Sequence, residues 1–387
     1  MASVSNINTG GSYDIIQTVF TLSMLSNSAN SVRHRSAEEI QKKLAADIEA
    51  GLKNDVTQIG SWTTVWGPVV FQNANSGVSD NAMYAAYNAT AKCYVVAVAA
   101  TNMHSTYDIN DLDLNVSSMT AFPLGITPQY STQPATTNVG NVSAGAALGI
   151  TNLLNMQDPS TKQSLQTYLN SINDADAILI FTGHSLGGSL SPTLAAWLYP
   201  SIPASWNAIY VVPTAGPSTG DQGFCTNFST VFPAYTIDGV NPAYGVFNQI
   251  IWNKFDCVPH AWTNIMNATP YEPENDIVWD PKIENGVVVR CNSIYHELTK
   301  INDTAAKVYA KIDSAYELAK GQDYIKSSNL MFIPPSLPPH IYSLDEFELQ
   351  VGKQHTTEYS AFFGVSTGKG EEQIGVALLT LAPTSER

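Results

Sequence analysis

The period of the hydrophobic pattern changes along the chain, and each period predicts a different kind of element. Residues 177–181 form an unbroken apolar run with two isoleucines, which is typical of a strand buried on both faces of a sheet. Directly after this run, apolar side chains recur at helical spacing at Leu190, Leu194, Trp197 and Leu198. The stretch therefore predicts a strand, a sharp turn and a helix.

The rest of the chain predicts further strands that alternate with helices. Strands are expected where apolar, aromatic and β-branched residues cluster, at residues 62–71, 93–100, 208–212, 247–252 and 347–351. Helices are expected at residues 36–54, 144–156 and 301–319. This alternation favours an α/β fold with a mostly parallel central sheet flanked by helices.

Composition and charge narrow the classes of function. The 387 residues are 44% hydrophobic and 13% charged, and we expect one domain with insertions. The net charge of -15 argues against nucleic acid and against docking on anionic membranes through a basic face. No apolar run approaches the roughly 18 residues of a membrane span, and no Lys or Arg precedes Arg33, so neither a transmembrane segment nor a signal peptide is expected. Secretion and a cytoplasmic location both stay open.

The four cysteines are far apart and show no metal or redox spacing. They are Cys93, Cys225, Cys257 and Cys291. We expect buried free thiols, with one or two disulfides as the alternative.

The turn after the first apolar run carries candidate chemistry. Gly183, Ser185 and Gly187 have the Gly-x-Ser-x-Gly spacing, in which glycines let the backbone bend sharply and present the serine hydroxyl. Because a helix follows, Ser185 would lie at a helix N-terminus, whose free N–H groups favour developing negative charge. Ser185 is therefore the candidate nucleophile.

A serine nucleophile needs a base that takes its proton, and the base needs a carboxylate that fixes its tautomer. Asp256 lies just past one predicted strand, and His355 follows another. The order Ser185, Asp256, His355 is the chain order of α/β-hydrolases. His340 and His296 stay open as alternative bases.

A second strand end is expected near the serine. The strand at residues 93–100 leads to Thr101 and Asn102, and sites gather at the carboxyl ends of strands in doubly wound sheets. A backbone N–H or a hydroxyl group there would supply half of an oxyanion hole.

Three stretches together resemble the class 3, or fungal-type, lipases. FTGHSLGGSL is similar to the serine turn of that family, TAGPSTGDQGF to its following Gly-Pro turn, and NKFDCVPH to its Asn-x-x-Asp-x-Val-Pro signature. The resemblance implies an α/β-hydrolase fold with Ser185 as nucleophile, Asp256 as acid and His355 as base. It also implies Leu186 and Thr101 as the oxyanion hole.

The chain departs from the family at one of these positions. The family usually has Arg-Gly before the oxyanion Thr or Ser, where this chain has Ala99 and Ala100. Asn102 therefore stays an alternative to Thr101. Asp111, in YDINDLDLN, resembles an aspartate of the family that we interpret as structural.

The resemblance covers roughly residues 93–364. We expect a single α/β-hydrolase domain over residues 1–387, with a helical N-terminal extension at 1–90, a candidate lid region at 104–166, and an insertion between acid and base at 261–342.

The candidate lid region is polar and loop-like, with isolated apolar residues at Met119, Phe122, Leu124 and Ile126. We expect these side chains to cover the serine in water and to turn toward a lipid surface on opening.

Taken together, these features predict a serine hydrolase that cleaves carboxylic esters of lipids, as a triacylglycerol lipase or carboxylesterase, through an acyl-enzyme on Ser185. A phospholipase or acyltransferase of the same fold, and a catalytically silent lipid-binding homologue, are the alternatives. The resemblance implies no cofactor and no metal. The expected partner is a lipid or small ester, at a lipid–water interface if the lid operates, and the sequence does not predict an oligomeric state.

Overall fold

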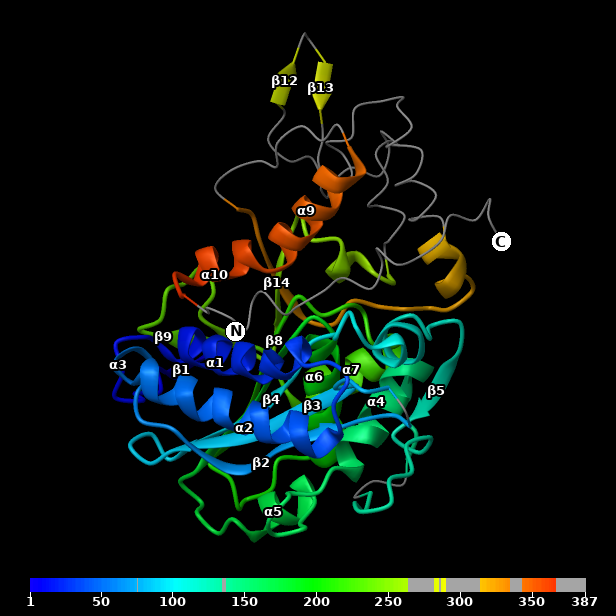
Figure 1. Cartoon of the computed structure of the whole chain (residues 1–387). Coiled ribbons are helices and arrows are strands. Elements are labelled where there is room, and N and C mark those ends of the chain that lie inside the picture. Colours follow the sequence, from blue (N-terminus) through cyan, green and yellow to red (C-terminus); the bar gives the residue numbers. More distant parts are fainter. Residues whose placement is uncertain are drawn as a thin grey trace.

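The computed structural model describes residues 1–74, 76–133, 137–263, 282–284, 287–289, 314–334 and 343–366. At its centre is a seven-stranded sheet with the strand order β14-β11-β8-β7-β4-β3-β2 (Figure 1). In chain order, the strands are β2 (Thr63–Phe71), β3 (Asn81–Asn88), β4 (Cys93–Val98), β7 (Ile178–His184), β8 (Ala208–Thr214), β11 (Ile250–Asn253) and β14 (Asn329–Phe332). The five strands from β4 to β14 run parallel, and β2 and β3 are antiparallel additions, so the expected mostly parallel sheet is confirmed.

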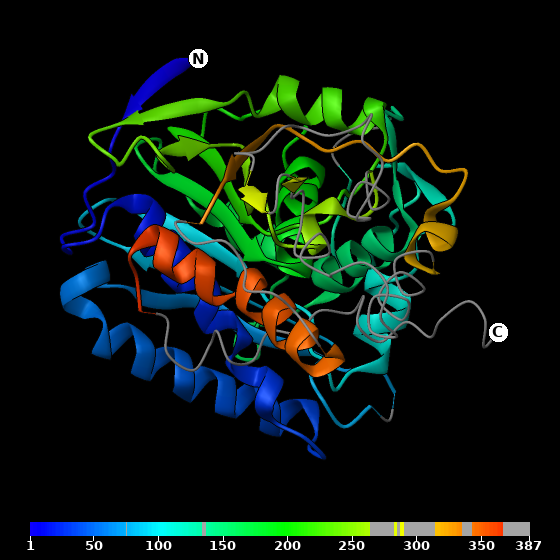
Figure 2. The same cartoon turned by 90° about the horizontal axis from the view of Figure 1, so that it is seen from above.

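Helices cover both faces of this sheet. They are α1 (Ile15–Leu25), α2 (Ala37–Asn54), α3 (Val56–Ile59), α4 (Ala144–Asn155), α5 (Leu165–Ser171), α6 (Leu186–Leu198), α7 (Gln222–Val231), α9 (Leu344–His355) and α10 (Thr357–Phe363). One buried cluster joins α4, α6 and α7 to the sheet, and a second joins α1, α2 and α10 to the opposite face. Figure 2 shows α9 and α10 passing over the sheet beside α1.

Shorter elements complete the described part of the chain. Strands β1 (Ala2–Ser5), β9 (Tyr235–Asp238) and β10 (Val246–Phe247) form a small sheet, while β5 (Met119–Phe122) pairs with β6 (Gly140–Ser143) and β12 (Lys282–Glu284) with β13 (Val287–Val289). Two 3₁₀-helices, η1 (Ser26–Ser31) and η3 (Val258–His260), and a π-helix, η2 (Asp108–Asp113), lie in the connections.

The strand register brings the carboxyl ends of three central strands together. Val98 of β4 lies opposite Gly183 of β7, and His184 of β7 lies opposite Thr214 of β8. Parallel strands in this register end at one edge of the sheet, which is where ligands bind in open α/β folds. Ser185 is the first residue beyond this edge.

The N-terminal part is less helical than its sequence suggested. The helix predicted at residues 36–54 is present as α2, with Ser36 and Glu39 in a capping box. However, residues 1–90 also contain β2, which was expected, and β3, which was not, and both belong to the main sheet. The stretch NAMYAAYN of β3 hides its strand character because its buried alanines give no strong β-propensity.

The prediction of a strand at residues 347–351 is wrong, because these residues lie in helix α9. The Ser343 side chain caps this helix by accepting the Glu346 N–H. Phe347 and Val351, four residues apart, are both buried, as on the inner face of a helix.

Two of the side chains that we expected to cover the serine lie in the core instead. Phe122 and Ile126 are buried in the core beneath α4 and α6, and the Phe122 ring packs edge-on against Phe224 with ring centroids 5.1 Å apart. Leu124 is exposed. The interpretation of Phe122 and Ile126 as lid residues is therefore wrong, because they stabilise the interior.

Within the described residues, no helix has the length and apolar content that a membrane span requires. Cys93, Cys225 and Cys257 are buried, and within the described residues none of them forms a disulfide. Cys291 and the alternative bases His296 and His340 lie outside the described residues.

Candidate active site

Ser185 sits on a sharp turn between β7 and α6. Its backbone has φ 58° and ψ -124°, a conformation that side chains rarely adopt, and its N–H donates to the Thr214 carbonyl at 3.0 Å. A Cβ atom at Gly187 would lie 2.3 Å from the Val98 carbonyl oxygen, so only glycine lets α6 start this close to β4. This packing holds Ser185 at the end of the sheet.

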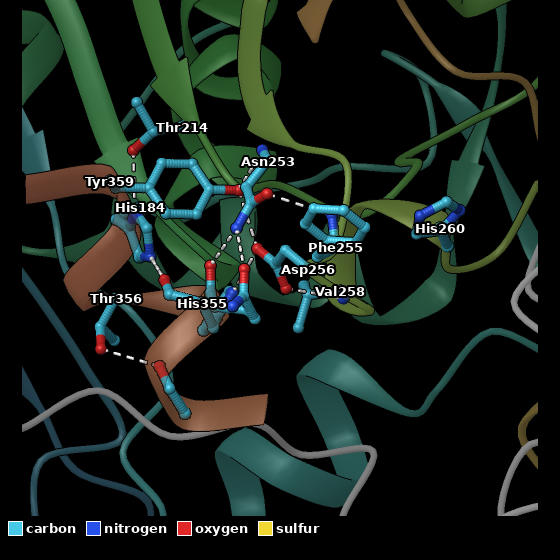
Figure 3. Close-up of polar contacts among 12 residues, drawn as sticks. His184, Thr214, Asn253, Phe255, Asp256, Val258, His260, His355, Thr356 and Tyr359 are labelled. Carbon is cyan, nitrogen blue, oxygen red and sulfur yellow. Dashed lines mark hydrogen bonds and ion pairs between the residues drawn. The ribbon is translucent and has the colours of Figure 1, made fainter. Parts of the chain in front are cut away.

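His355 and Asp256, which are 99 residues apart, form a buried pair (Figure 3). The His355 Nδ1–H donates to Asp256 Oδ2 at 2.8 Å, and neither residue is exposed. With Nδ1 as the donor, the neutral ring has its lone pair on Nε2. Within the described residues, this buried Nε2 has no hydrogen-bond partner, so it is available to accept a proton.

Asp256 is held by further donors besides the histidine. The Tyr359 hydroxyl donates to Oδ2 at 2.8 Å, and the Val258 N–H donates to Oδ1 at 3.0 Å. Burial, reinforced by the negative charge of Asp256, raises the pKa of Tyr359 far above its usual range, so the tyrosine stays a neutral donor. These bonds fix the carboxylate in the orientation that meets His355.

Asn253 connects the loop of the acid to the helix of the base. Its side-chain amide donates to both the backbone oxygen and the side-chain oxygen of Gln354, at 2.9 and 2.8 Å (Figure 3). Its backbone N–H donates to the Tyr359 hydroxyl oxygen at 3.0 Å. The Asn of the NKFDCVPH stretch therefore has a positioning role that spacing alone did not reveal.

His184 forms a second connection, which sequence reasoning missed. Its Nε2 lies 2.7 Å from the His355 backbone oxygen and its Nδ1 lies 2.9 Å from Thr214 Oγ1. Burial, together with the positive charge that His355 can carry, lowers the pKa of His184 well below its usual range, so the ring is neutral. The carbonyl can only accept, so Nε2–H donates to it and Nδ1 accepts from Thr214. His184, the residue before Ser185, thus connects the backbone of the base His355 to Thr214 at the end of β8.

Thr101 and Ser185 line one small pocket, which confirms that the two strand ends meet. Its lining residues are Thr101, Asp113, Leu114, Ser185, Pro217, Val258, Ala261 and Trp262. The pocket holds about 20 Å³, room for about one water molecule. Leu186 begins α6, where the first-turn N–H groups lack partners within the helix.

Asn102, the alternative to Thr101 in the sequence analysis, is not suited to donate to an oxyanion. Its N–H donates to Asp108 Oδ2 and its side-chain amide donates to the Ser79 carbonyl, both at 2.9 Å. Both groups are therefore already engaged. Thr101 is the better candidate because it lines the pocket of Ser185.

The partner of the Thr101 hydroxyl is Asp113. Thr101 Oγ1–H donates to Asp113 Oδ2 at 2.7 Å. Burial raises the pKa of Asp113 to about 7, against the opposing effects of the Thr101 hydrogen bond and the charge of His355. Asp111 is exposed.

The N-terminal segment contacts the backbone just after β4, where this chain has Ala99 and Ala100 in place of the Arg-Gly of the family. The Ala100 N–H donates to Asn27 Oδ1 at 2.7 Å, and the Asn30 side-chain amide approaches the carbonyls of Ala100 and Thr101 at 3.4 and 3.3 Å. Both asparagines lie in η1 and are buried. Side chains of η1 thus hold the backbone around Thr101 by hydrogen bonds.

Residues 95–266 match the family model for lipase (class 3). The chain is a carboxylic ester hydrolase. The matched segment contains Thr101, Ser185, Leu186 and Asp256, and it ends before His355. No curated protein sequence matches this chain.

Solved structures of lipases are similar to this chain to different degrees. The structure of M37 lipase has a TM-score of 0.64 and 23% sequence identity, and the match covers 95% of this chain and 97% of that chain. The nonglycosylated LIP2 lipase of Yarrowia lipolytica has a TM-score of 0.43 and 17% identity, with 67% and 77% covered. Lipase II of Rhizopus niveus has a TM-score of 0.40 and 17% identity, with 64% and 74% covered. The similarity to M37 lipase and the family match make the fold an α/β-hydrolase.

Proposed function

We propose that the chain hydrolyses carboxylic esters of lipids, as a triacylglycerol lipase or carboxylesterase, through an acyl-enzyme on Ser185. The observation that carries the proposal is the buried 2.8 Å hydrogen bond between His355 Nδ1 and Asp256. It leaves the His355 Nε2 lone pair available, and His184 ties the His355 backbone to the strand end beside Ser185. A serine on a strained turn with an oriented histidine and a carboxylate is the constellation of acyl-transfer catalysis.

In the first half of the reaction, His355 Nε2 takes the proton of the Ser185 hydroxyl while Oγ attacks the ester carbonyl carbon. The carbonyl oxygen becomes an oxyanion, for which the N–H groups of Thr101 and Leu186 are the donors. Asp256 stabilises the imidazolium of His355. The imidazolium then gives its proton to the leaving alkoxide, and the ester bond breaks.

In the second half, water replaces the alcohol. His355 takes a proton from the water as its oxygen attacks the acyl carbon, and the same donors hold the second oxyanion. His355 returns the proton to Ser185 Oγ, which releases the carboxylic acid and restores the enzyme.

The test of the nucleophile is Ser185→Ala. We expect a loss of turnover of about a thousandfold or more, with unchanged folding, and loss of labelling by a fluorophosphonate probe. The matched control is Ser191→Ala in the same helix, because the buried Ser191 hydroxyl has no hydrogen-bond partner in the described part of the chain. A Ser185→Ala variant with activity near wild type would overturn the assignment. If the wild-type protein is labelled by the probe but hydrolyses no ester of any acyl length, the catalytically silent homologue is favoured instead.

A further inference from the structure

The N-terminal segment places two buried asparagines beside the strand end that carries Thr101. Both lie in η1, which follows α1 directly, and Asn27 is 0% and Asn30 is 3% exposed. The Tyr84 hydroxyl of β3 donates to the Leu22 carbonyl of α1 at 2.7 Å. This bond ties the end of α1 to the main sheet, so the position of η1 relative to the strand ends is set by the fold.

The two asparagines use opposite ends of the amide group. Asn27 is an acceptor, because the Ala100 N–H donates to its Oδ1 at 2.7 Å. Asn30 is a donor, because its Nδ2 donates to the carbonyl oxygens of Ala100 and Thr101 at 3.4 and 3.3 Å. A primary amide carries both a donor and an acceptor, so asparagine suits both positions. Three backbone groups just after β4 are thus bonded to η1.

These bonds determine where the Thr101 N–H points. The Ala100 carbonyl and the Thr101 N–H belong to one peptide group, and in a planar trans peptide the two point in opposite directions. Because Asn30 holds the carbonyl on the side of η1, the Thr101 N–H points away from η1. Thr101 lines the pocket of Ser185, so this pocket is where its N–H can find an acceptor.

The Thr101 N–H is the group in this stretch that the fold does not use. The N–H groups before and after it donate to Asn27 Oδ1 and to Asp108 Oδ2. Thr101 is 1% exposed, and no described residue accepts a hydrogen bond from its N–H. A buried N–H without a partner is rare in folded proteins, and at a reactive serine it is the donor that an oxyanion needs.

We propose that Asn27 and Asn30 are positioning residues of the oxyanion hole, an inference that rests on the acyl-enzyme proposed above. They hold the peptide between Ala100 and Thr101 with its N–H aimed at the ester oxygen before the substrate binds. A donor that is oriented in advance costs no reorganisation when the charge develops. The N-terminal segment, which lies outside the matched residues 95–266, thereby takes part in the reaction.

The test is a comparison of kcat and KM on a soluble butyrate ester for Asn27→Leu and Asn30→Leu. Leucine is close to asparagine in shape but has no donor or acceptor. We expect kcat to fall about 10- to 100-fold and KM to stay within about twofold, because a misaligned oxyanion donor weakens binding of the transition state more than binding of the substrate. Each kcat is expressed per active site, counted from the end point of fluorophosphonate labelling.

Inhibition by butylboronic acid gives a second readout. A boronic acid forms a tetrahedral adduct with a serine nucleophile, so its inhibition constant should rise by about the factor by which kcat falls. The matched control is Ser28→Ala in the same 3₁₀-helix, because the Ser28 hydroxyl donates to the Leu25 carbonyl within the segment at 3.0 Å. This variant should keep the wild-type kcat, KM and inhibition constant.

A merely structural role for the asparagines would lower the midpoint of unfolding and the number of labelled sites, but not the kcat of each labelled site. An unchanged kcat per site in both leucine variants, or a loss that appears in KM alone, would overturn the inference. If a leucine variant does not fold, Asn27→Ala and Asn30→Ala remove the same hydrogen bonds without adding apolar bulk. When Ser185→Ala is inactive and the asparagine variants keep their kcat, only the role of the asparagines fails; when Ser185→Ala is active, the proposed function fails.

Discussion

The proposed triad could be predicted from the sequence, but the residues that would support it could not. Ser185, Asp256 and His355 follow from the chemistry of a serine nucleophile and from the chain order of a fold. His184 contacts the backbone of His355, which is 171 residues away in the sequence. A sequence pattern does not reveal such contacts, because they depend on tertiary packing.

The contact between Thr101 and Asp113 is a further example of packing that the sequence does not reveal. The run YDINDLDLN offers three aspartates within six residues, and η2 winds them as a π-helix. This rare geometry changes which side chains share a face, so helical spacing does not tell which carboxyl group reaches Thr101. The structure assigns that contact to Asp113.

Asp113→Asn should make stability less dependent on pH. Because burial raises the pKa of Asp113 to about 7, the folded state keeps a proton that the unfolded chain releases near pH 4. Wild-type stability is therefore lost progressively as the pH rises from about 4 to about 7, and asparagine avoids that loss while its carbonyl still accepts from Thr101.

Urea unfolding at pH 4.5 and pH 8 measures the effect of Asp113→Asn. We expect a gain of roughly 1–2 kcal/mol over wild type at pH 8, after allowing for solvent screening, and little difference at pH 4.5. Asp111→Asn is the matched control, since Asp111 is exposed, and it should leave both values unchanged. An equal gain at both pH values would show that Asp113 is not the group that titrates.

At the scale of elements, strong and weak patterns had different outcomes. The apolar run of β7 and the capped, one-sided pattern of α2 predicted their elements correctly. Residues 347–351 failed because Phe347 and Val351 fit the alternation of a strand as well as the inner face of a helix. The helix cap at Ser343, four residues before the predicted strand, distinguishes a helix from a strand here.

Phe122→Ser tests the correction of the lid residues. Phe122 is 1% exposed and packs against Phe224 beside α4 and α6, so the substitution removes core contacts and buries a hydroxyl group. We expect a loss of about 3–5 kcal/mol in the free energy of unfolding, as is typical of large-to-small core changes. Leu124→Ser, at an exposed residue two positions further on, should change it by less than about 0.5 kcal/mol.

Chemical denaturation of both variants provides the measurement. If Phe122→Ser keeps wild-type stability and weakens only the rise of activity at a lipid interface, Phe122 acts as a lid residue and the assignment to the core is overturned.

At the scale of the whole molecule, the sequence predicted the α/β-hydrolase fold. It did not predict how much the N-terminal segment contributes to the main sheet and to the backbone beside Thr101. Asn27 in η1 holds the backbone next to Thr101, and β2 and β3 extend the main sheet. The division into a domain core, an extension, a lid region and an insertion stays a prediction. Its boundaries depended on a resemblance that begins at about residue 93, whereas the sheet begins at Thr63.

The net charge of -15 leads to a prediction about how the protein meets lipid surfaces. A molecule with 33 acidic and 18 basic residues is repelled by an anionic interface, and salt screens this repulsion. We expect triglyceride emulsions stabilised by an anionic surfactant to be hydrolysed several-fold more slowly than neutral ones at about 10 mM salt, where the screening length is about 30 Å. Near 0.3 M salt, where this length falls well below about 8 Å, the two rates should approach each other. The measurement is initial rate against salt on both emulsions, with a soluble butyrate ester as the control that should not respond. Faster hydrolysis of the anionic emulsion at low salt would mean that a local basic surface, and not the overall charge, governs how the protein meets lipid.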